Sequence, residues 1–419
     1  MLNRPNGVAG RLYDFLRQRE PRYFDLLRRM VEVNSFTNHL PGIEALGDLT
    51  AEAFADLGFS GERVVDGNPK FGRHLVLTRE ARSPDAPRIG FLSHLDTVFP
   101  PEEEELHDFR WRQEGDRLYG PGTIDIKGGT VVVYMILDAL KTVMPEVFDS
   151  VSWVVLLDSA EEQGPAGFQA LCLERLPAER TLACLVVEGG LLEGGEATVV
   201  VARKGIAVFR LEVRGRASHA GSGHSHGASA VAQLADVVRR IEAWTDYERE
   251  LTFNVGAVGG GTVHNRVPHA AWAEVEMRTF STEVYAEGMA EMLALEDYSS
   301  VRSASGNHAC SVHVAVEVEY PPWPRDPATD RLLGIWQGAA EALGMRVEPE
   351  KKGGLSDANL VWRDLPTLDG LGPAGANAHC SERSADGTKD QEYALRSSFV
   401  PKALLNITAI LKLLDAKSK

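Results

Sequence analysis

Two short, valine-rich apolar runs constrain the fold of this chain more than any other feature. They are Val151–Leu157 and Leu182–Val187, and both are nearly continuous in apolar residues. A strand that is apolar along its length must be covered on both faces, which is typical of interior strands in an α/β sheet. Helix-like segments at Ile43–Leu57 and Gly128–Leu140 alternate with these runs and with a strand-like segment at Arg88–Leu95. The first half therefore predicts a layered α/β domain.

The pattern changes near Lys204, where a second module begins. Ile206–Val213 alternates apolar and polar residues as a half-exposed strand does, and Gly227–Trp244 has the spacing of an amphipathic helix. Further strand-like and helix-like segments follow. Pro321–Pro327 then holds four prolines, which favours a boundary there.

The length of the chain also points to two domains, because 419 residues are too many for one ordinary core. We expect a catalytic domain formed by residues 1–203 and 321–419, with an α/β architecture in which helices sandwich a mixed sheet. Residues 204–320 would form an inserted α+β domain, a small sheet with helices on one face. Such an insert would be a lid-like domain.

Composition excludes several classes of partner. The net charge of −16 disfavours nucleic acid and anionic membrane surfaces. The four cysteines form no C-x-x-C pair, so they predict free thiols rather than disulfides or a thiolate zinc site. We find no segment with the length and apolarity of a membrane span, and no apolar run at the N-terminus. The expected location is therefore cytoplasmic.

Candidate catalytic and metal-binding residues lie at or just after the ends of the predicted strands. His94 and Asp96 close the strand-like segment and point the same way, since side chains alternate along a strand. Asp125 lies on a glycine-flanked loop before an apolar helix, and Glu161 and Glu162 follow a buried strand. Each has a structural alternative: a hydrogen-bonded pair for His94 and Asp96, an N-cap for Asp125, and a solvated acidic turn for the two glutamates.

Two further candidates complete the set. Glu188 follows the run Leu182–Val187, and His379 lies on a glycine-rich loop far downstream. Two adjacent glutamates at a strand end repel each other unless a cation compensates them. Imidazole and carboxylate ligands without thiolates suit catalytic zinc, with cobalt or manganese as substitutes. Lys127 and the acidic run Glu102–Glu105 are expected to be solvated or locally paired charges.

With these residues in hand, the chain resembles the di-zinc metallopeptidase family of glutamate carboxypeptidase, aminoacylase, acetylornithine deacetylase and succinyl-diaminopimelate desuccinylase. The resemblance spans nearly the whole chain, and several ordered motifs carry it. These motifs are Ser93–Pro100, Gly120–Gly129, Glu161-Glu162, Gly215–Gly221, Gly353–Ala358 and the loop of His379.

The resemblance implies two zinc ions per subunit. Asp125 would bridge them, His94 and Glu188 would complete one site, and Glu162 and His379 would complete the other. Asp96 would orient the imidazole of His94. A glutamate at position 188, where the deacetylase and desuccinylase branch tends to carry aspartate, leans toward the glutamate carboxypeptidase and aminoacylase branch.

The middle domain would form a homodimer. By resemblance, His219 would reach the active site of the partner subunit and stabilise the oxyanion. Asn265 and Arg278 match positions that bind the substrate carboxylate. Structurally, Asn265 could instead form a turn before Pro268, and Arg278 could terminate a strand.

The expected activity is metal-dependent hydrolysis of an amide bond in a small peptide or an N-acyl amino acid, with carboxypeptidase-like specificity. A water between the two metals would attack the amide, and Glu161 would act as general base. Deacylation of an N-acyl amino acid and aminopeptidase action on short peptides are alternatives. A non-catalytic binding relative is a further one, although its signature would be the loss of Glu161 or of ligand residues.

Overall fold

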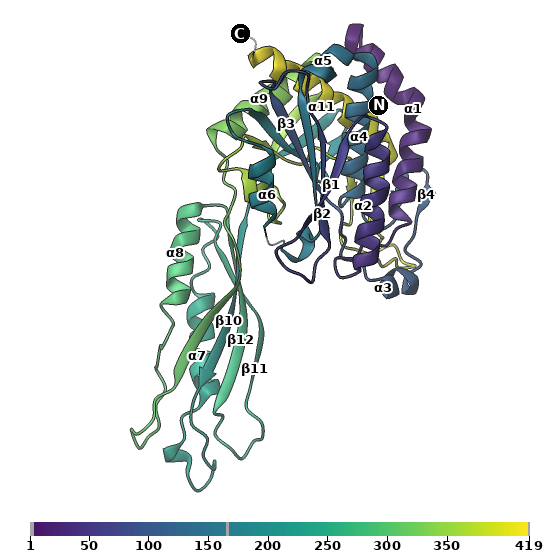
Figure 1. The fold of residues 1–419 in the computed structure, drawn as a ribbon. Coiled ribbons are helices and arrows are strands. Elements are labelled where there is room, and N and C mark those ends of the chain that lie inside the picture. Colours follow the sequence, from purple (N-terminus) through teal and green to yellow (C-terminus); the bar gives the residue numbers. More distant parts are fainter. Residues whose placement is uncertain (1–3, 165–166, 418–419) are drawn as a thin grey trace. The chain divides into compact units, whose positions relative to one another are not determined.

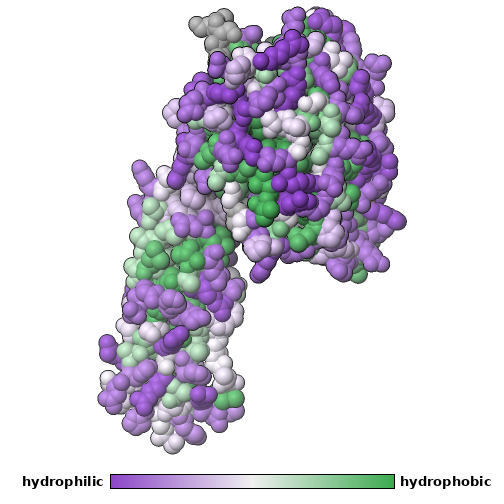
Figure 2. Space-filling model, in the orientation of Figure 1, coloured by the Kyte–Doolittle hydropathy of each residue, from purple (hydrophilic) through white to green (hydrophobic). Residues whose placement is uncertain are grey.

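The computed structural model describes residues 4–164 and 167–417, and these form two compact units (Figure 1). Within the described residues, the larger unit comprises residues 4–164, 167–201, 325–351 and 356–417. The smaller unit comprises Ala202–Pro324 and Lys352–Leu355. Hydrophilic residues cover most of the visible surface of the larger unit (Figure 2).

A six-stranded mixed sheet forms the centre of the larger unit, which confirms the predicted α/β class. The strand order is β1-β2-β6-β3-β7-β15. β6, β3, β7 and β15 run parallel to one another, and β2 pairs antiparallel with both β1 and β6. The strands are β1 (Ser60–Val65), β2 (Arg73–Arg79), β3 (Arg88–His94), β6 (Ser152–Asp158), β7 (Thr181–Val186) and β15 (Thr367–Leu368).

Apolar residues on both sides of β6 explain why the sheet is covered on both faces. Trp153, Val155 and Leu157 belong to one large core, together with residues of the helices on that side. Val154 and Leu156 alternate with them and are equally buried, and α6 (Phe168–Arg175) packs against β6. The helices that share the large core are α1 (Gly7–Val31), α2 (Leu40–Ala55), α4 (Lys127–Val143), α9 (Pro327–Ala342) and α11 (Arg396–Lys417).

Part of α11 departs from the expectation that no segment resembles a membrane span. Arg396–Ala416 is long and apolar enough to cross a membrane, but 67% of its apolar window is buried inside the structure. The helix packs against α1, α4 and α9. Its apolar side chains therefore serve the core of the larger unit.

The smaller unit is a four-stranded antiparallel sheet with two helices. The strand order is β11-β12-β10-β13. Alternate residues of β10, such as Phe209 and Leu211, share a core with α7 and α8, so the two helices lie on one face. The elements are β10 (Gly205–Arg214), β11 (Thr252–Gly260), β12 (Ala270–Thr279), β13 (Ser311–Tyr320), α7 (Ala230–Glu242) and α8 (Thr282–Leu293).

Two expectations about charged residues were wrong in part. Lys127 is not solvated: it is 2% exposed, and its ammonium donates to the carbonyl of Val33 at 3.0 Å. The acidic run at Glu102–Glu105 is not a solvated loop. It lies in the short helix α3 (Pro101–Leu106), where Glu103 and Glu104 are half-buried. Neither burial could be predicted from local composition, because distant segments cover these side chains.

Glycine at position 129 is required by a close approach of α4 to the end of β7. A Cβ atom there would lie 2.0 Å from the carbonyl oxygen of Val187. We therefore expect Gly129→Ala to lower the free energy of unfolding by about 1–3 kcal/mol through overpacking. Gly334→Ala in helix α9 is the matched control, because nothing lies within 4 Å of its Cβ. The control should be neutral or should stabilise by up to about 1 kcal/mol. Urea denaturation of both variants measures the difference, and equal effects would contradict the packing argument.

Candidate metal centre

The candidate site lies at the carboxyl ends of the parallel strands, where side chains from different strands meet. His94 ends β3 and pairs in register with Asp158 at the end of β6. The amide of Leu95 donates to the carbonyl of Asp158 at 2.6 Å, which ties the two strand ends together. Glu188 follows the end of β7, the strand on the other side of β3. The strand register thus brings these segments together.

Asp125 occupies the centre of the site and faces two histidines. One carboxylate oxygen lies 3.0 Å from Nε2 of His94, and the other lies 3.2 Å from Nε2 of His379. Glu188 Oε1 is 3.7 Å from Nε2 of His94, and Glu162 Oε1 is 3.2 Å from Nε2 of His379. The five predicted ligand residues therefore form two groups of three that share Asp125.

Asp96 connects the imidazole of His94 to the turn that carries the two glutamates. Nδ1 of His94 lies 3.0 Å from the backbone carbonyl of Asp96 and 3.3 Å from its Oδ1. Because a carbonyl can only accept, Nδ1 carries a proton, and Nε2 is the ring nitrogen that faces the other residues of the site. The carboxylate of Asp96 also accepts from the amides of Glu161 and Glu162, both at 3.2 Å, and from the hydroxyl of Thr37 at 2.7 Å.

Burial governs the protonation of the glutamates. It raises the pKa of Glu161 well above its ordinary value, and the neighbouring carboxylates of Glu162, Glu188 and Asp125 raise it further. Burial likewise raises the pKa of Glu162. For Asp125, burial acts in the same direction, but hydrogen bonds from His379 and His94 outweigh it and hold its pKa far below the ordinary range. Ionised Asp125 therefore lies beside carboxyl groups that resist ionisation.

The three remaining predicted residues, His219, Asn265 and Arg278, lie in the smaller unit. His219 is exposed, and the amide of the adjacent Ala220 donates to the carbonyl of Asn265 at 3.0 Å. Nδ1 of His219 accepts from the amides of Gly221 and Ser222, so a neutral ring carries its proton on Nε2.

Arg278 lies at the other end of the same sheet. It pairs with Ile206 at the start of β10, whereas His219 and Asn265 lie beyond the opposite end, where Arg214 pairs with Ala270. Eight residues of extended strand separate Ala270 from Arg278, about 26 Å. The guanidinium of Arg278 binds both carboxylate oxygens of Glu276 and the carbonyl of Gly353. The structure therefore brings His219 and Asn265 together but separates both from Arg278.

Comparison with known proteins identifies the family. The family model described as Peptidase family M20/M25/M40 matches residues 90–402, which is most of the chain. The chain belongs to this peptidase family. The matched region contains every residue of the two ligand groups. Peptidases of this family are metal-dependent, and the chain is accordingly a metallopeptidase or amidohydrolase by family.

Similar proteins match most of the length of this chain. It is 26% identical over 372 residues to carboxypeptidase G2 of Pseudomonas sp. (strain RS-16), covering 88% of this chain and 85% of the relative. It is 23% identical to a succinyl-diaminopimelate desuccinylase of Erythrobacter litoralis, covering 85% and 91%. Among solved structures, aminopeptidase PepT from Bacillus cereus superposes with a TM-score of 0.73 at 22% identity, covering 94% and 99%. The last likeness supports the fold.

The donor set fits the metal that the M20/M25/M40 family implies. Two ligands 2.0–2.2 Å from a tetrahedral zinc ion lie roughly 3.3–3.6 Å apart. The nitrogen–oxygen distances within the two groups span 3.0–3.7 Å. Oε1 of Glu162 is buried, and it faces Nε2 of His379 at 3.2 Å, as two ligands of one ion would. The two groups therefore have donor types and spacings that suit divalent metal ions.

One residue beside the site was missed by sequence reasoning. Glu392 is completely buried, and its Oε1 accepts from the amides of Ile124 at 3.0 Å and Asp125 at 3.3 Å. Burial raises its pKa to about 8. Only its position, a lone glutamate in a polar segment just before strand β17 (Tyr393–Leu395), could have drawn attention to it.

The stability of the metal-free protein should fall as the pH rises from about 6 to about 8.5. Folding raises the pKa values of His379 and Glu392, so in this range the folded state retains protons that the unfolded chain has released. A raised folded pKa contributes stability that is lost as the pH rises through it. Bound metal would replace those protons.

We therefore expect the increase in Tm on adding zinc to be larger at about pH 8.5 than at about pH 6, because the metal compensates carboxylates that are then ionised. Differential scanning fluorimetry with chelated and zinc-loaded protein measures both values. A larger increase at the lower pH would contradict the assignment.

Proposed function

We propose that this protein hydrolyses an amide bond in a small peptide or an N-acyl amino acid, with carboxypeptidase-like specificity. One observation carries the proposal: the groups His94, Asp125, Glu188 and Asp125, Glu162, His379 share one carboxylate and lie beside Glu161. The name of the relative carboxypeptidase G2 supports the carboxypeptidase branch, although its identity to this chain is only 26%.

The two groups would each hold one divalent ion, zinc by donor type, with cobalt or manganese as substitutes. When bound, such ions polarise the amide carbonyl and lower the pKa of a water nucleophile. Asp125 would serve both ions, since its oxygens face different histidines. Asp96 would hold the imidazole of His94 in the tautomer that directs Nε2 at the ion.

Glu161 is the proposed general base. It is half-buried, and its raised pKa makes it ready to accept a proton from the attacking water and to return it to the leaving amine. The bond from its own amide to Asp96 fixes its backbone next to His94. Glu162 is the next residue, and consecutive side chains point in different directions. Its carboxylate would therefore bind the metal ion while that of Glu161 faces the substrate.

The smaller unit would supply groups that bind the substrate. His219 carries its proton on Nε2 and is exposed, which suits a donor to the developing oxyanion. Asn265, which lies beside His219, and Arg278 would each bind the carboxylate of a substrate. A small substrate cannot span the roughly 26 Å between Arg278 and the other two. This separation favours a homodimer in which His219 and Asn265 act on the partner's substrate.

An exposed sheet edge supports the same homodimer. β11 is an edge strand of the four-stranded sheet, and Val258 on it is 59% exposed. Val231 of α7 is also exposed and would meet a Cβ placed on Gly260 of β11. An apolar, unpaired strand edge is suited to pairing with another chain.

Two alternatives differ in which side of the amide is recognised. Deacylation of an N-acyl amino acid is favoured by the relatives named succinyl-diaminopimelate desuccinylase. Aminopeptidase action on short peptides would match the names of structural neighbours, which support the fold alone. The glutamate at position 188 leans toward the carboxypeptidase branch by resemblance. A non-catalytic relative is disfavoured because Glu161 and all five ligand residues are retained.

Replacing Glu161 with glutamine should lower kcat by about 10²–10⁴-fold, because the amide cannot accept a proton. The measurement is ninhydrin-detected hydrolysis of N-acetyl amino acids, dipeptides and acyl-glutamates by the wild type and the variant. Metal content by mass spectrometry is the control and should stay unchanged. A variant that retained full turnover with any substrate that the wild type cleaves would contradict the role of Glu161.

A mixing experiment tests whether His219 acts in the partner's site. Glu161→Gln and His219→Ala homodimers should each be nearly inactive. When they are unfolded, mixed and refolded, half of the dimers are hybrids, and each hybrid has one intact site if His219 acts across the dimer. The mixture should then recover about a quarter of wild-type activity. No recovery, in mixtures that form hybrid dimers by native mass spectrometry, would show that His219 acts within its own chain.

A further inference from the structure

His379 differs from the other ligand residues in how it is supported. The side chain of His94 is 1% exposed at the end of a central strand, whereas that of His379 is 52% exposed on a long loop. This loop runs between β16 (Gly375–Ala376) and β17. Asn377 and His379 both adopt a positive φ, of 63° and 66°. This left-handed conformation is unfavourable for most residues other than glycine. Contacts from outside must therefore hold His379 in place.

Hydrogen bonds join the residues that follow His379 to the residues at the far end of the loop. The amide of Glu392 donates to the carbonyl of Cys380 at 2.8 Å. Nε2 of Gln391 donates to the carbonyl of Ser381 at 2.7 Å. These two bonds close the loop at its base, so a displacement of Gln391 or Glu392 would be transmitted to the backbone of His379.

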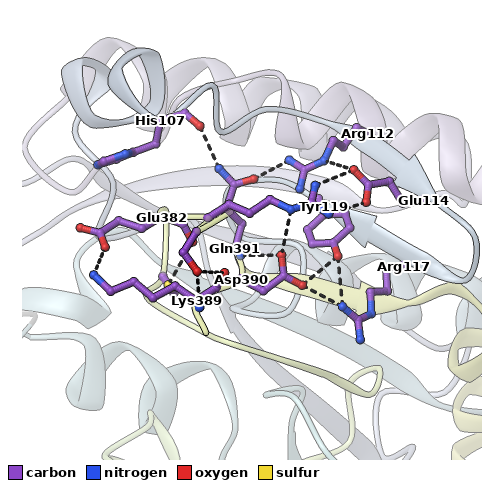
Figure 3. Close-up of polar contacts among 12 residues, drawn as sticks. His107, Arg112, Glu114, Arg117, Tyr119, Glu382, Lys389, Asp390 and Gln391 are labelled. Atoms are coloured by element: carbon purple, nitrogen blue, oxygen red, sulfur yellow. Dashed lines mark hydrogen bonds and ion pairs between the residues drawn. The ribbon is translucent and has the colours of Figure 1, made fainter. Parts of the chain in front are cut away.

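Gln391 also fastens this base to His107, directly after α3, and to a neighbouring hairpin, as Figure 3 shows. Its Nε2 donates to the carbonyl of His107 at 2.9 Å, and its Oε1 accepts from the guanidinium of Arg112. The hairpin consists of β4 (Arg112–Glu114) and β5 (Arg117–Tyr119). Gln391 is 2% exposed, so each of its three bonds forms away from water.

Asp390 makes a second attachment to the same hairpin. Its Oδ2 accepts from Arg117 at 2.7 Å and from the hydroxyl of Tyr119 at 2.9 Å (Figure 3). Arg383, on the loop itself, donates to both carboxylate oxygens of Glu114. The hairpin is thus a rigid support for the loop rather than a part of the ligand set.

Glu392 extends the connection to the other side of the site. Through its Oε1 it holds the amides of Ile124 and Asp125, while its own amide holds Cys380. One buried residue therefore links the segment of Asp125, through its side chain, to the segment of His379, through its backbone amide. Its Oε2 is buried and has no hydrogen-bond partner among the described residues.

We propose that Gln391 and Glu392 are positioning residues that hold His379 opposite Asp125 and so set the metal affinity of the group Asp125, Glu162 and His379. The inference rests on the proposed function, because it takes that group to be a metal site. The group His94, Asp125 and Glu188 depends on strand ends instead, so disruption of Gln391 affects one of the two ions selectively.

Gln391→Glu tests the selective effect with little change of shape. The variant keeps an acceptor for Arg112 but loses the two bonds donated to His107 and Ser381. Zinc content is measured by mass spectrometry after equilibration in a series of zinc-buffered solutions. We expect the variant to retain one ion with wild-type affinity and to bind the second about 10–100-fold more weakly.

Lys389→Ala is the matched control. Lys389 lies on the same loop, but its ion pair with Glu382 is exposed and does not attach the loop to the hairpin. The control should bind two ions as the wild type does. If Gln391→Glu also binds two ions with unchanged affinity, the positioning role is overturned while the proposed function stands. If the wild type binds no zinc, both proposals are overturned.

Glu392 provides a second test that does not depend on the folding of Gln391→Glu. Glu392→Gln retains the Oε1 acceptor for Ile124 and Asp125, and should keep the second ion nearly as well as the wild type. Glu392→Ala removes the acceptor, so this variant should lose the second ion. Circular dichroism of the metal-free variants tests that both are folded. Equal losses in the two variants would overturn the role of the hydrogen bonds.

Discussion

A single carboxylate shared by two imidazoles organises the candidate site. Asp125 offers one oxygen to His94 and the other to His379, and these contacts join a buried strand end to an exposed loop. Glu162 and Glu188 complete the two groups from the ends of other strands. The parallel register of β3 and β6, the close approach of α4 permitted by Gly129, and the bonds of Glu392 all serve to hold Asp125 where both histidines reach it.

The electrostatics of the site have one simple consequence. Several carboxyl groups are buried within a few ångströms of one another, and burial raises the pKa values of Glu161, Glu162 and Glu392. Such a cluster is unfavourable unless protons or cations neutralise it. In a metal-dependent peptidase the ions supply that charge, and Glu161, which belongs to neither ligand group, would remain available as the proposed general base.

Much of this could be predicted from the sequence because the relevant physics is local. The apolar run Val151–Leu157 predicts an interior strand, and β6 occupies Ser152–Asp158. Strand register then brings His94, Glu162 and Glu188 together without further information. The burial of Lys127 and Glu392 could not be predicted, because each depends on segments far away in sequence. The separation of Arg278 from His219 likewise follows from the antiparallel pairing of β10 and β12, which motifs alone do not contain.

The measurement that tests this account most directly is anomalous X-ray diffraction at the zinc edge from crystals of the zinc-loaded protein. The account predicts two peaks roughly 3.5–4 Å apart, one on either side of the Asp125 carboxylate. One peak should lie against His94 and Glu188, and the other against Glu162 and His379. Peaks located elsewhere, or a fully loaded crystal with no peak beside Asp125, would contradict the assignment of this site.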